Sequence, residues 1–262
     1  MDSYLERIGV ARPAVADLAA LRVLQRAHLM AVPFENLSVH LGEEIVLESA
    51  ALVAKVVDRR RGGFCYELNG AFAALLASLG YEVTLHSCRV WTGERFGVPL
   101  DHMALRVQLD APYLVDVGFG RFAQHPLRMD VTGPQVDPAG VFEVLPDGAD
   151  LAVRGDGTWE YMLDQRPYEL SDFTPLSWWH RTSPASHFTR QLTCSIVTDT
   201  GRVTLSGRNL ITTTAPVGGN GDHGGGGERT ERVLEDDAEV LAVYRDTFGI
   251  RLDTVPVVGV RG

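Results

Sequence analysis

One cysteine of the chain stands where its thiol would act as a nucleophile. Cys65 follows Gly62 and Gly63, which permit a tight turn that larger side chains would block. The apolar pattern of the next residues predicts a helix that begins near the cysteine and ends at Gly80. Unpaired amides and the dipole at a helix N-terminus favour the thiolate, which is the nucleophilic form. An isolated cysteine is also explained as a small buried residue that fills the start of a helix.

A histidine and an aspartate lie on two later apolar segments. Residues 103–109 alternate between apolar and polar, which predicts a strand with His102 on the face opposite its apolar side chains. Asp116 interrupts a second apolar strand, where a carboxylate rarely faces inward without a partner. Taken singly, each residue also has a structural interpretation, as a hydrogen-bonded histidine or as a surface aspartate.

Together, Cys65, His102 and Asp116 supply a nucleophile, a base that takes its proton and a carboxylate that orients the base. The two strands predict a hairpin in which the histidine and the aspartate have the same parity and can share a face. A tight hairpin register pairs Asp116 with Arg106 instead of His102. Direct contact then requires a bulge, a twist or another pairing, which the following glycines permit.

The composition excludes several classes of protein. The 262 residues are 45% hydrophobic and 22% charged, as in globular proteins, and the formal net charge of −10 disfavours binding to nucleic acid or anionic membranes. Three cysteines without ligand spacing predict neither a metal site nor a disulfide framework. Without a secretory leader or a run long enough to span a bilayer, the sequence predicts a cytoplasmic protein.

Hydrophobic periodicity changes twice along the chain. It predicts a helical first part, an antiparallel β middle part in the form of a barrel or sandwich, and a mixed last part. Helices are expected over residues 17–30, 49–60, 65–79 and 236–248, and strands over 81–91, 103–109, 113–117, 142–153, 159–163, 192–198, 202–206 and 209–214. The glycine-rich residues 218–227 are expected to form a flexible loop with a solvated His223.

These residues give the chain a resemblance to the arylamine N-acetyltransferases over nearly its whole length. The motifs that carry it are residues 4–9, 32–37, 61–67, 115–120, 183–188 and 205–208, together with His102. The cysteine segment with its downstream histidine and aspartate is the most specific part. The resemblance implies an α+β fold with a cysteine-protease-like Cys-His-Asp core. It divides the chain into a helical domain over 1–83, a β-barrel domain over 84–188 and an α/β lid over 189–262.

The resemblance also implies a reaction. Cys65 would accept an acetyl group from acetyl-CoA and pass it to an arylamine, a hydrazine or a similar amine, with His102 as the base and Asp116 as the orienting carboxylate. Acetyl-CoA would be a co-substrate, and no permanently bound cofactor is expected. Three alternatives remain: an amide synthase that acts on polyketide chains held by an acyl carrier protein, a cysteine hydrolase or transglutaminase-like enzyme, and a non-catalytic binding protein.

Further residues take roles from the same resemblance or from their charge. The substrate-binding and CoA-binding residues would be Phe34 by the acceptor, Phe119 and Gly120 by the acyl donor, and Phe64. Cations considered for the pyrophosphate of the donor are Lys55, Arg59, Arg60 and Arg208, each equally explained as a solvated charge. We expect an ion pair between Glu35 and Arg61 that steadies the cysteine turn. We also expect Asp101, where many relatives carry a hydroxyl residue, to alter the histidine or the mouth of the donor site.

Overall fold

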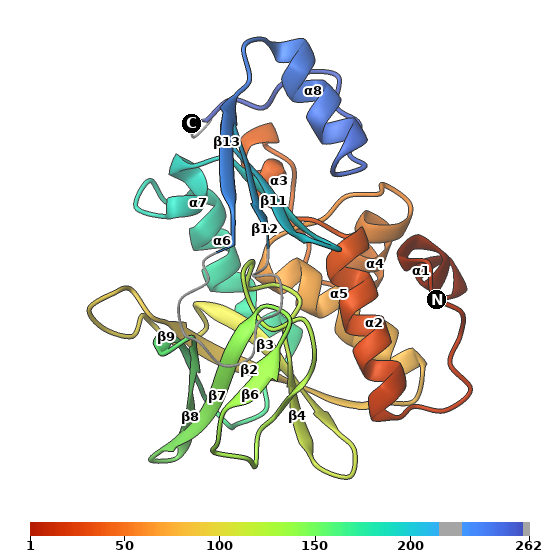
Figure 1. Cartoon of the computed structure of the whole chain (residues 1–262), viewed down its shortest axis with the longest axis vertical. Helices are drawn as coiled ribbons and strands as arrows, with labels where there is room; N and C mark the ends of the chain where they lie inside the picture. Colours follow the sequence, from red (N-terminus) through yellow and green to blue (C-terminus); the bar gives the residue numbers. More distant parts are fainter. Residues whose placement is uncertain (215–226, 259–262) are drawn as a thin grey trace.

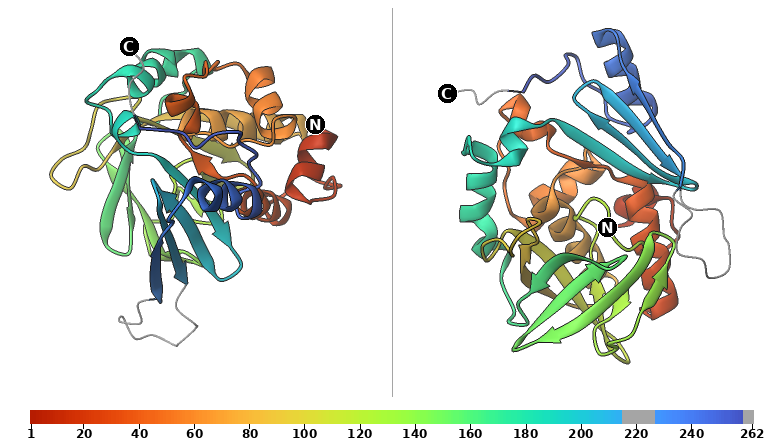
Figure 2. Two further views of the ribbon diagram at one scale, coloured as in Figure 1. Left: turned by 90° about the horizontal axis from the view of Figure 1, so that it is seen from above. Right: turned by 60° about the vertical axis from the view of Figure 1, so that its left-hand side comes forward.

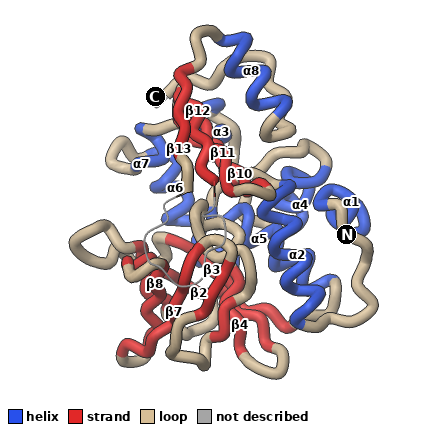
Figure 3. The backbone as a smooth tube through the Cα atoms, viewed as in Figure 1, coloured by secondary structure: helices blue, strands red, loops and turns tan. Residues whose placement is uncertain are grey.

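The computed structural model describes residues 1–214 and 227–258. Figure 1 shows a curled sheet at one end of the molecule, helix α8 (Asp237–Asp246) at the other, and most of the remaining helices between them. The separation of helical and strand regions is plain in Figure 3. The expected α+β class is therefore confirmed. His223 and residues 218–226 of the expected loop lie outside the described part.

Most helices of the first part pack around one hydrophobic core, whereas the short helix Leu37–Leu41 contributes Leu37 and Leu41 to a separate core. Their bounds are α1 Asp2–Ile8, α2 Leu18–Ala31, α3 Leu37–Leu41, α4 Ser49–Val57 and α5 Cys65–Ser78. Asp17 caps α2 by accepting a hydrogen bond from the Ala20 amide at 2.8 Å, and the apolar stripe of α2 is buried. The helix expected over 49–60 ends at Val57, and its N-cap is Glu48 instead of Ser49.

The middle part forms one antiparallel sheet of eight strands in the order β5-β4-β3-β2-β9-β8-β7-β6. The strands are β2 Glu82–Val90, β3 His102–Gln108, β4 Pro112–Val115, β5 Leu127–Arg128, β6 Gln135–Asp137, β7 Gly140–Asp147, β8 Asp150–Gly155 and β9 Thr158–Leu163. The sheet curls until β5 lies against β7, which nearly closes a barrel. Successive side chains of a strand point to opposite faces of the sheet. Ala104 and Leu114 therefore lie in the barrel core, whereas Leu105 and Val115 pack against the helices.

The last part carries a second sheet in the order β1-β10-β11-β12-β13. Its strands are β1 Phe34–Glu35, β10 Thr193–Thr198, β11 Gly201–Ser206, β12 Asn209–Thr214 and β13 Arg229–Val233, and α8 packs its buried Val240 and Tyr244 into the same core. The right-hand view of Figure 2 shows this sheet beside the N-terminal helices. Strand β1 comes from the first part of the chain, so it crosses the expected domain division, which stays a prediction.

Short helices connect the barrel to this second sheet. They are the 3-10 helix η1 Leu170–Phe173, α6 Thr174–Thr182 and α7 His187–Arg190. Within the two described stretches, no helix combines the length and the apolar character needed to cross a bilayer.

Candidate active site

Cys65 is the first residue of α5, as the sequence predicts, and it is buried with 4% exposure. The two glycines before it are required by close packing. A Cβ added at Gly62 would lie 1.8 Å from the carbonyl oxygen of Pro33, and one at Gly63 would lie 2.6 Å from the Cβ of Glu67. Any other residue at either position would force the turn away from its neighbours, so the turn fixes where α5 begins.

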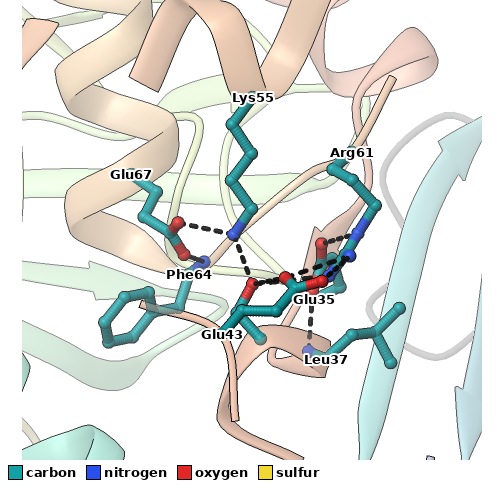
Figure 4. A network of polar contacts seen from close by, with 8 residues as sticks. Glu35, Leu37, Glu43, Lys55, Arg61, Phe64 and Glu67 are labelled. Carbon is teal, nitrogen blue, oxygen red and sulfur yellow. Dashed lines mark hydrogen bonds and ion pairs between the residues drawn. The ribbon is translucent and has the colours of Figure 1, made fainter. Parts of the chain in front are cut away.

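A buried network of charges lies behind this turn (Figure 4). The expected ion pair is present, with Arg61 Nε 2.9 Å from Glu35 Oε1. Arg61 also contacts Glu43 at 3.2 Å. A second pair joins Lys55 Nζ to Glu67 Oε1 at 2.5 Å, with both side chains 4% exposed. Lys55 is therefore held inside the protein, which removes it from the cations considered for the pyrophosphate.

The two carboxylates that bind these cations differ in how well they are compensated. Burial raises the pKa of Glu35, but the charges of Arg61 and Lys55 and hydrogen bonds from Arg61 and the Leu37 amide outweigh it, so the pKa lies below its usual value. Burial dominates at Glu67 and, with the repulsion from Glu35, leaves its pKa above the usual value despite Lys55. Glu67 is thus the less compensated of the two.

His102 and Asp116 form a direct contact, with Nε2 2.7 Å from Oδ2, and both are buried. Of the alternatives left open for the hairpin, the structure shows another pairing in place of the tight register. Leu105 pairs with Val115, so the register continues to Asp116 beside Ala104, on the face that His102 shares. Strand β4 ends at Val115, which leaves Asp116 free to turn toward the imidazole without a bulge.

Asn69 holds the aspartate and was missed in the sequence. Its Nδ2 donates to Asp116 Oδ1 at 2.9 Å and to the carbonyl of Met103 at 2.6 Å, and its Oδ1 accepts from the Val117 amide at 2.9 Å. Asn69 lies one helical turn after Cys65, on the same face of α5. That spacing was the available signal, and it makes Asn69 the link between the cysteine helix and the His102–Asp116 pair.

The turn after Asp116 rests on the start of α5. A Cβ added at Gly118 would lie 2.7 Å from Cys65 Cα and 2.8 Å from Asn69 Nδ2. Met103, the neighbour of His102 on β3, belongs to the same buried cluster as Cys65. The structure thus brings Cys65 close to the residues that flank both His102 and Asp116.

Burial changes the behaviour expected of the thiol. It raises the pKa of Cys65 well above the usual value, and the carboxylates of Asp116 and Asp101 raise it further, although the amides of Met103 and Tyr66 oppose them. The helix N-terminus therefore does not suffice to make a thiolate. A thiolate here needs a neighbouring base that takes the proton and remains beside it as a cation.

The residues expected to bind substrates lie among aromatic rings. The ring of Phe119 is 5.0 Å from that of His102, between centroids, and Gly120 has a φ of 91°, which favours glycine. Phe34 and Phe64 lie 6.2 and 5.5 Å from Phe188. Phe64 is 1% exposed, so in this structure its side chain packs against protein neighbours. Their roles in binding stay predictions.

Comparison with known proteins places the chain in a family. The family model described as N-acetyltransferase matches residues 17–257. An arylamine N-acetyltransferase of Mycolicibacterium smegmatis is 37% identical over an alignment of 265 positions, which covers 96% of this chain and 92% of that protein. The solved structure of the M. smegmatis enzyme superposes with a TM-score of 0.84 at 34% identity, covering 95% of this chain and 92% of that one.

A third relative is the arylamine N-acetyltransferase of Mycobacterium marinum, solved in complex with CoA. It is 34% identical with a TM-score of 0.83, and the match covers 95% of this chain and 92% of that one. The fold and the comparisons define an N-acetyltransferase. More narrowly, the chain belongs to the arylamine N-acetyltransferase family and is an enzyme of that family.

Proposed function

We propose that the chain moves an acetyl group from acetyl-CoA to an arylamine or hydrazine through a thioester on Cys65. The observation that carries this proposal is the buried His102–Asp116 contact of 2.7 Å, set against the helix that begins at Cys65. A buried cysteine with a raised thiol pKa needs a base beside it, and a histidine already fixed by a carboxylate is suited to that role.

In the first half-reaction, the thiol proton moves to His102 and the sulfur attacks the thioester carbonyl. An ionised carboxylate only accepts hydrogen bonds, so Asp116 holds the proton on Nε2 and leaves the Nδ1 lone pair to receive the thiol proton. The carbon–sulfur bond of the donor then breaks. CoA leaves as a thiol with the proton from the imidazolium, and the acetyl group stays on Cys65.

In the second half-reaction, a neutral amine attacks the acetyl carbon of the acyl-enzyme. His102 takes a proton from the attacking nitrogen, and the Cys65 sulfur leaves as the amide forms; the imidazolium then returns the proton to the sulfur, which restores the thiol. The first amides of a helix have no acceptor within the helix, so those of Cys65 and Tyr66 at the start of α5 are suited to stabilise the oxyanion in both steps.

The surrounding rings suit the two substrates. Phe119 and Gly120, beside His102, are proposed to contact the acyl donor. Phe34 and Phe64, beside Phe188, are proposed to contact the aromatic acceptor. The CoA complex of the M. marinum relative supports a CoA thioester as the donor class.

The decisive experiment is an intact-mass measurement after incubation with acetyl-CoA and no amine. One added acetyl group on the wild type, absent from Cys65→Ala and lost when aniline is added, would support the thioester and the ping-pong order. If Cys65 reacts with iodoacetamide but gains no acetyl group, the donor is a longer or carrier-bound acyl chain, as in the amide synthases. Acetanilide formed by Cys65→Ala at the wild-type rate would refute the assigned nucleophile.

A further inference from the structure

The carboxylate of Glu67 touches the residue that precedes the nucleophile. Glu67 is the third residue of α5, and its Oε2 accepts a hydrogen bond from the Phe64 amide at 3.2 Å. Because phenylalanine has no side-chain acceptor, this contact is the only half of a capping box that these residue types allow. It fixes the peptide that enters α5 one residue before Cys65.

A lysine from another helix fixes the carboxylate in turn. Lys55 of α4 donates to Glu67 Oε1 at 2.5 Å and to Ser38 Oγ at 2.8 Å. Figure 4 shows one oxygen of Glu67 joined to Lys55 and the other joined to the Phe64 amide. The two Glu67 oxygens therefore have different partners, and the side chain is restrained from both.

Gly63 leaves space in the turn for the Glu67 carboxylate. A Cβ added at Gly63 would lie 2.6 Å from Glu67 Oε2 and 2.8 Å from its carboxyl carbon. Any side chain at Gly63 would therefore push the carboxylate off the Phe64 amide. The glycine, the carboxylate and the lysine form one arrangement, in which the absence of one Cβ makes room for the contact.

Stability alone does not explain a buried ion pair at this position. Removing two charges from water costs free energy, and a hydrophobic pair of the same volume does not carry this cost. A buried ion pair is therefore weak evidence for stability. The charge-assisted hydrogen bond of 2.5 Å from Lys55, however, is stronger than a neutral one, which suits a carboxylate that must keep its position. The pair is accordingly better explained by the position that it imposes.

We infer that Glu67, held by Lys55, is a positioning residue for Cys65, fixing the start of α5 so that the sulfur and the first free amides meet the acyl group together. The inference rests on the proposed function of Cys65. Neither Glu67 nor Lys55 touches the reacting atoms in this scheme. Their effect is expected in the rate of acetylation at saturating acetyl-CoA, with KM for acetyl-CoA little changed.

Two matched double variants separate positioning from charge balance. Lys55→Met with Glu67→Gln removes both charges and keeps an acceptor for the Phe64 amide, whereas Lys55→Met with Glu67→Leu removes both charges and the acceptor. Misplacement on the order of 1 Å costs roughly 10²-fold in rate. We therefore expect the Leu variant to acetylate Cys65 at least ~10-fold more slowly than the Gln variant, which should stay within ~3-fold of the wild type.

Gly63→Ala provides a second variant, because the added Cβ crowds both the Cβ and the carboxylate of Glu67 while both charges remain. It should reproduce the slow acetylation of the Leu variant. Melting temperatures by circular dichroism are measured for all variants alongside the single-turnover rates. Equal rates in the two double variants, or rates that fall only in proportion to the melting temperature, would overturn the inference.

Reaction with iodoacetamide distinguishes this failure from failure of the proposed function. Alkylation depends on Cys65 and its surroundings but not on acyl-CoA. If the wild type gains no acetyl group while alkylation still differs between the Gln and Leu variants, the positioning role stands and the acetyl donor is wrong. If acetylation proceeds but neither reaction distinguishes the variants, the positioning role is wrong and the proposed function stands.

Discussion

Replacing Gly118 with alanine is expected to misplace the nucleophile without removing any reactive group. The new Cβ would lie 2.7 Å from Cys65 Cα and 2.9 Å from the Cys65 carbonyl oxygen. Non-bonded carbon atoms rest at about 3.5 to 4.0 Å, so the turn and the start of α5 must separate by about 1 Å. Both neighbours are backbone atoms, which cannot rotate away. A displacement of this size costs on the order of 10²-fold in rate.

The assay for Gly118→Ala is the single-turnover rate of acetyl transfer to Cys65, followed by intact mass after rapid quenching. Overpacking of this kind costs about 1 to 3 kcal/mol of stability, so the variant should remain folded at room temperature. Gly133→Ala is the matched control, because an added Cβ there meets no atom within 4 Å and the rate should not change. A wild-type rate in folded Gly118→Ala would refute the claim that this contact aligns the site.

Three further predictions follow from individual side chains. Asp116→Asn should lower the steady-state rate by about 10³- to 10⁴-fold, because an amide no longer selects the tautomer of the imidazole; a rate within tenfold of the wild type would contradict the assigned role. Burial raises the pKa of Glu160 from 4.5 to about 7, so the stability from its protonated form is complete below pH 4.5 and is lost as the pH rises through about 7. Glutamine does not ionise, so the free energy of unfolding of Glu160→Gln should rise relative to that of the wild type by about 1 to 2 kcal/mol between about pH 5 and pH 8, a value reduced because the group is half-buried. A difference in stability between variant and wild type that is the same at both pH values would argue against this. Exchanging the charges of Glu35 and Arg61 should not restore the fold that either single change damages, because Glu35 also accepts a hydrogen bond from the Leu37 amide at 2.6 Å, which arginine cannot do; a double variant that melts like the wild type would disprove this.

Much of the fold follows from short-range patterns in the sequence. Helices α2 and α5 have apolar stripes with clear ends, and β10 to β12 alternate around turns, so their types were predictable. Strand β13 was missed because all of its residues are exposed and carry no alternation. Strands β5 and β6 are only two and three residues long, which is too short to show a period.

The residue types of the candidate site were predictable, but its contacts were not. The hairpin register depends on a loop of three residues, 109–111, between the paired residues Gln108 and Pro112. A tighter turn would place Asp116 opposite Arg106, two positions from Ala104. Asn69 is hydrogen-bonded to Asp116, 47 residues further along the sequence, and the two meet because α5 packs on β3. The raised pKa of Cys65 likewise depends on burial, which the helix position alone does not reveal.

The two-residue strand β1 has a consequence for the order of folding. On one side, Glu35 donates its amide to the Gly63 carbonyl in the cysteine turn at 2.9 Å, and on the other, Phe34 and Glu35 pair with Ser195 and Cys194 of β10. During synthesis, the cysteine turn leaves the ribosome long before the strand that closes the far edge of β1. Contacts of such wide sequence separation form late, so in a nascent chain the cysteine turn can lean on only one edge of β1 until β10 has emerged to pair with the other.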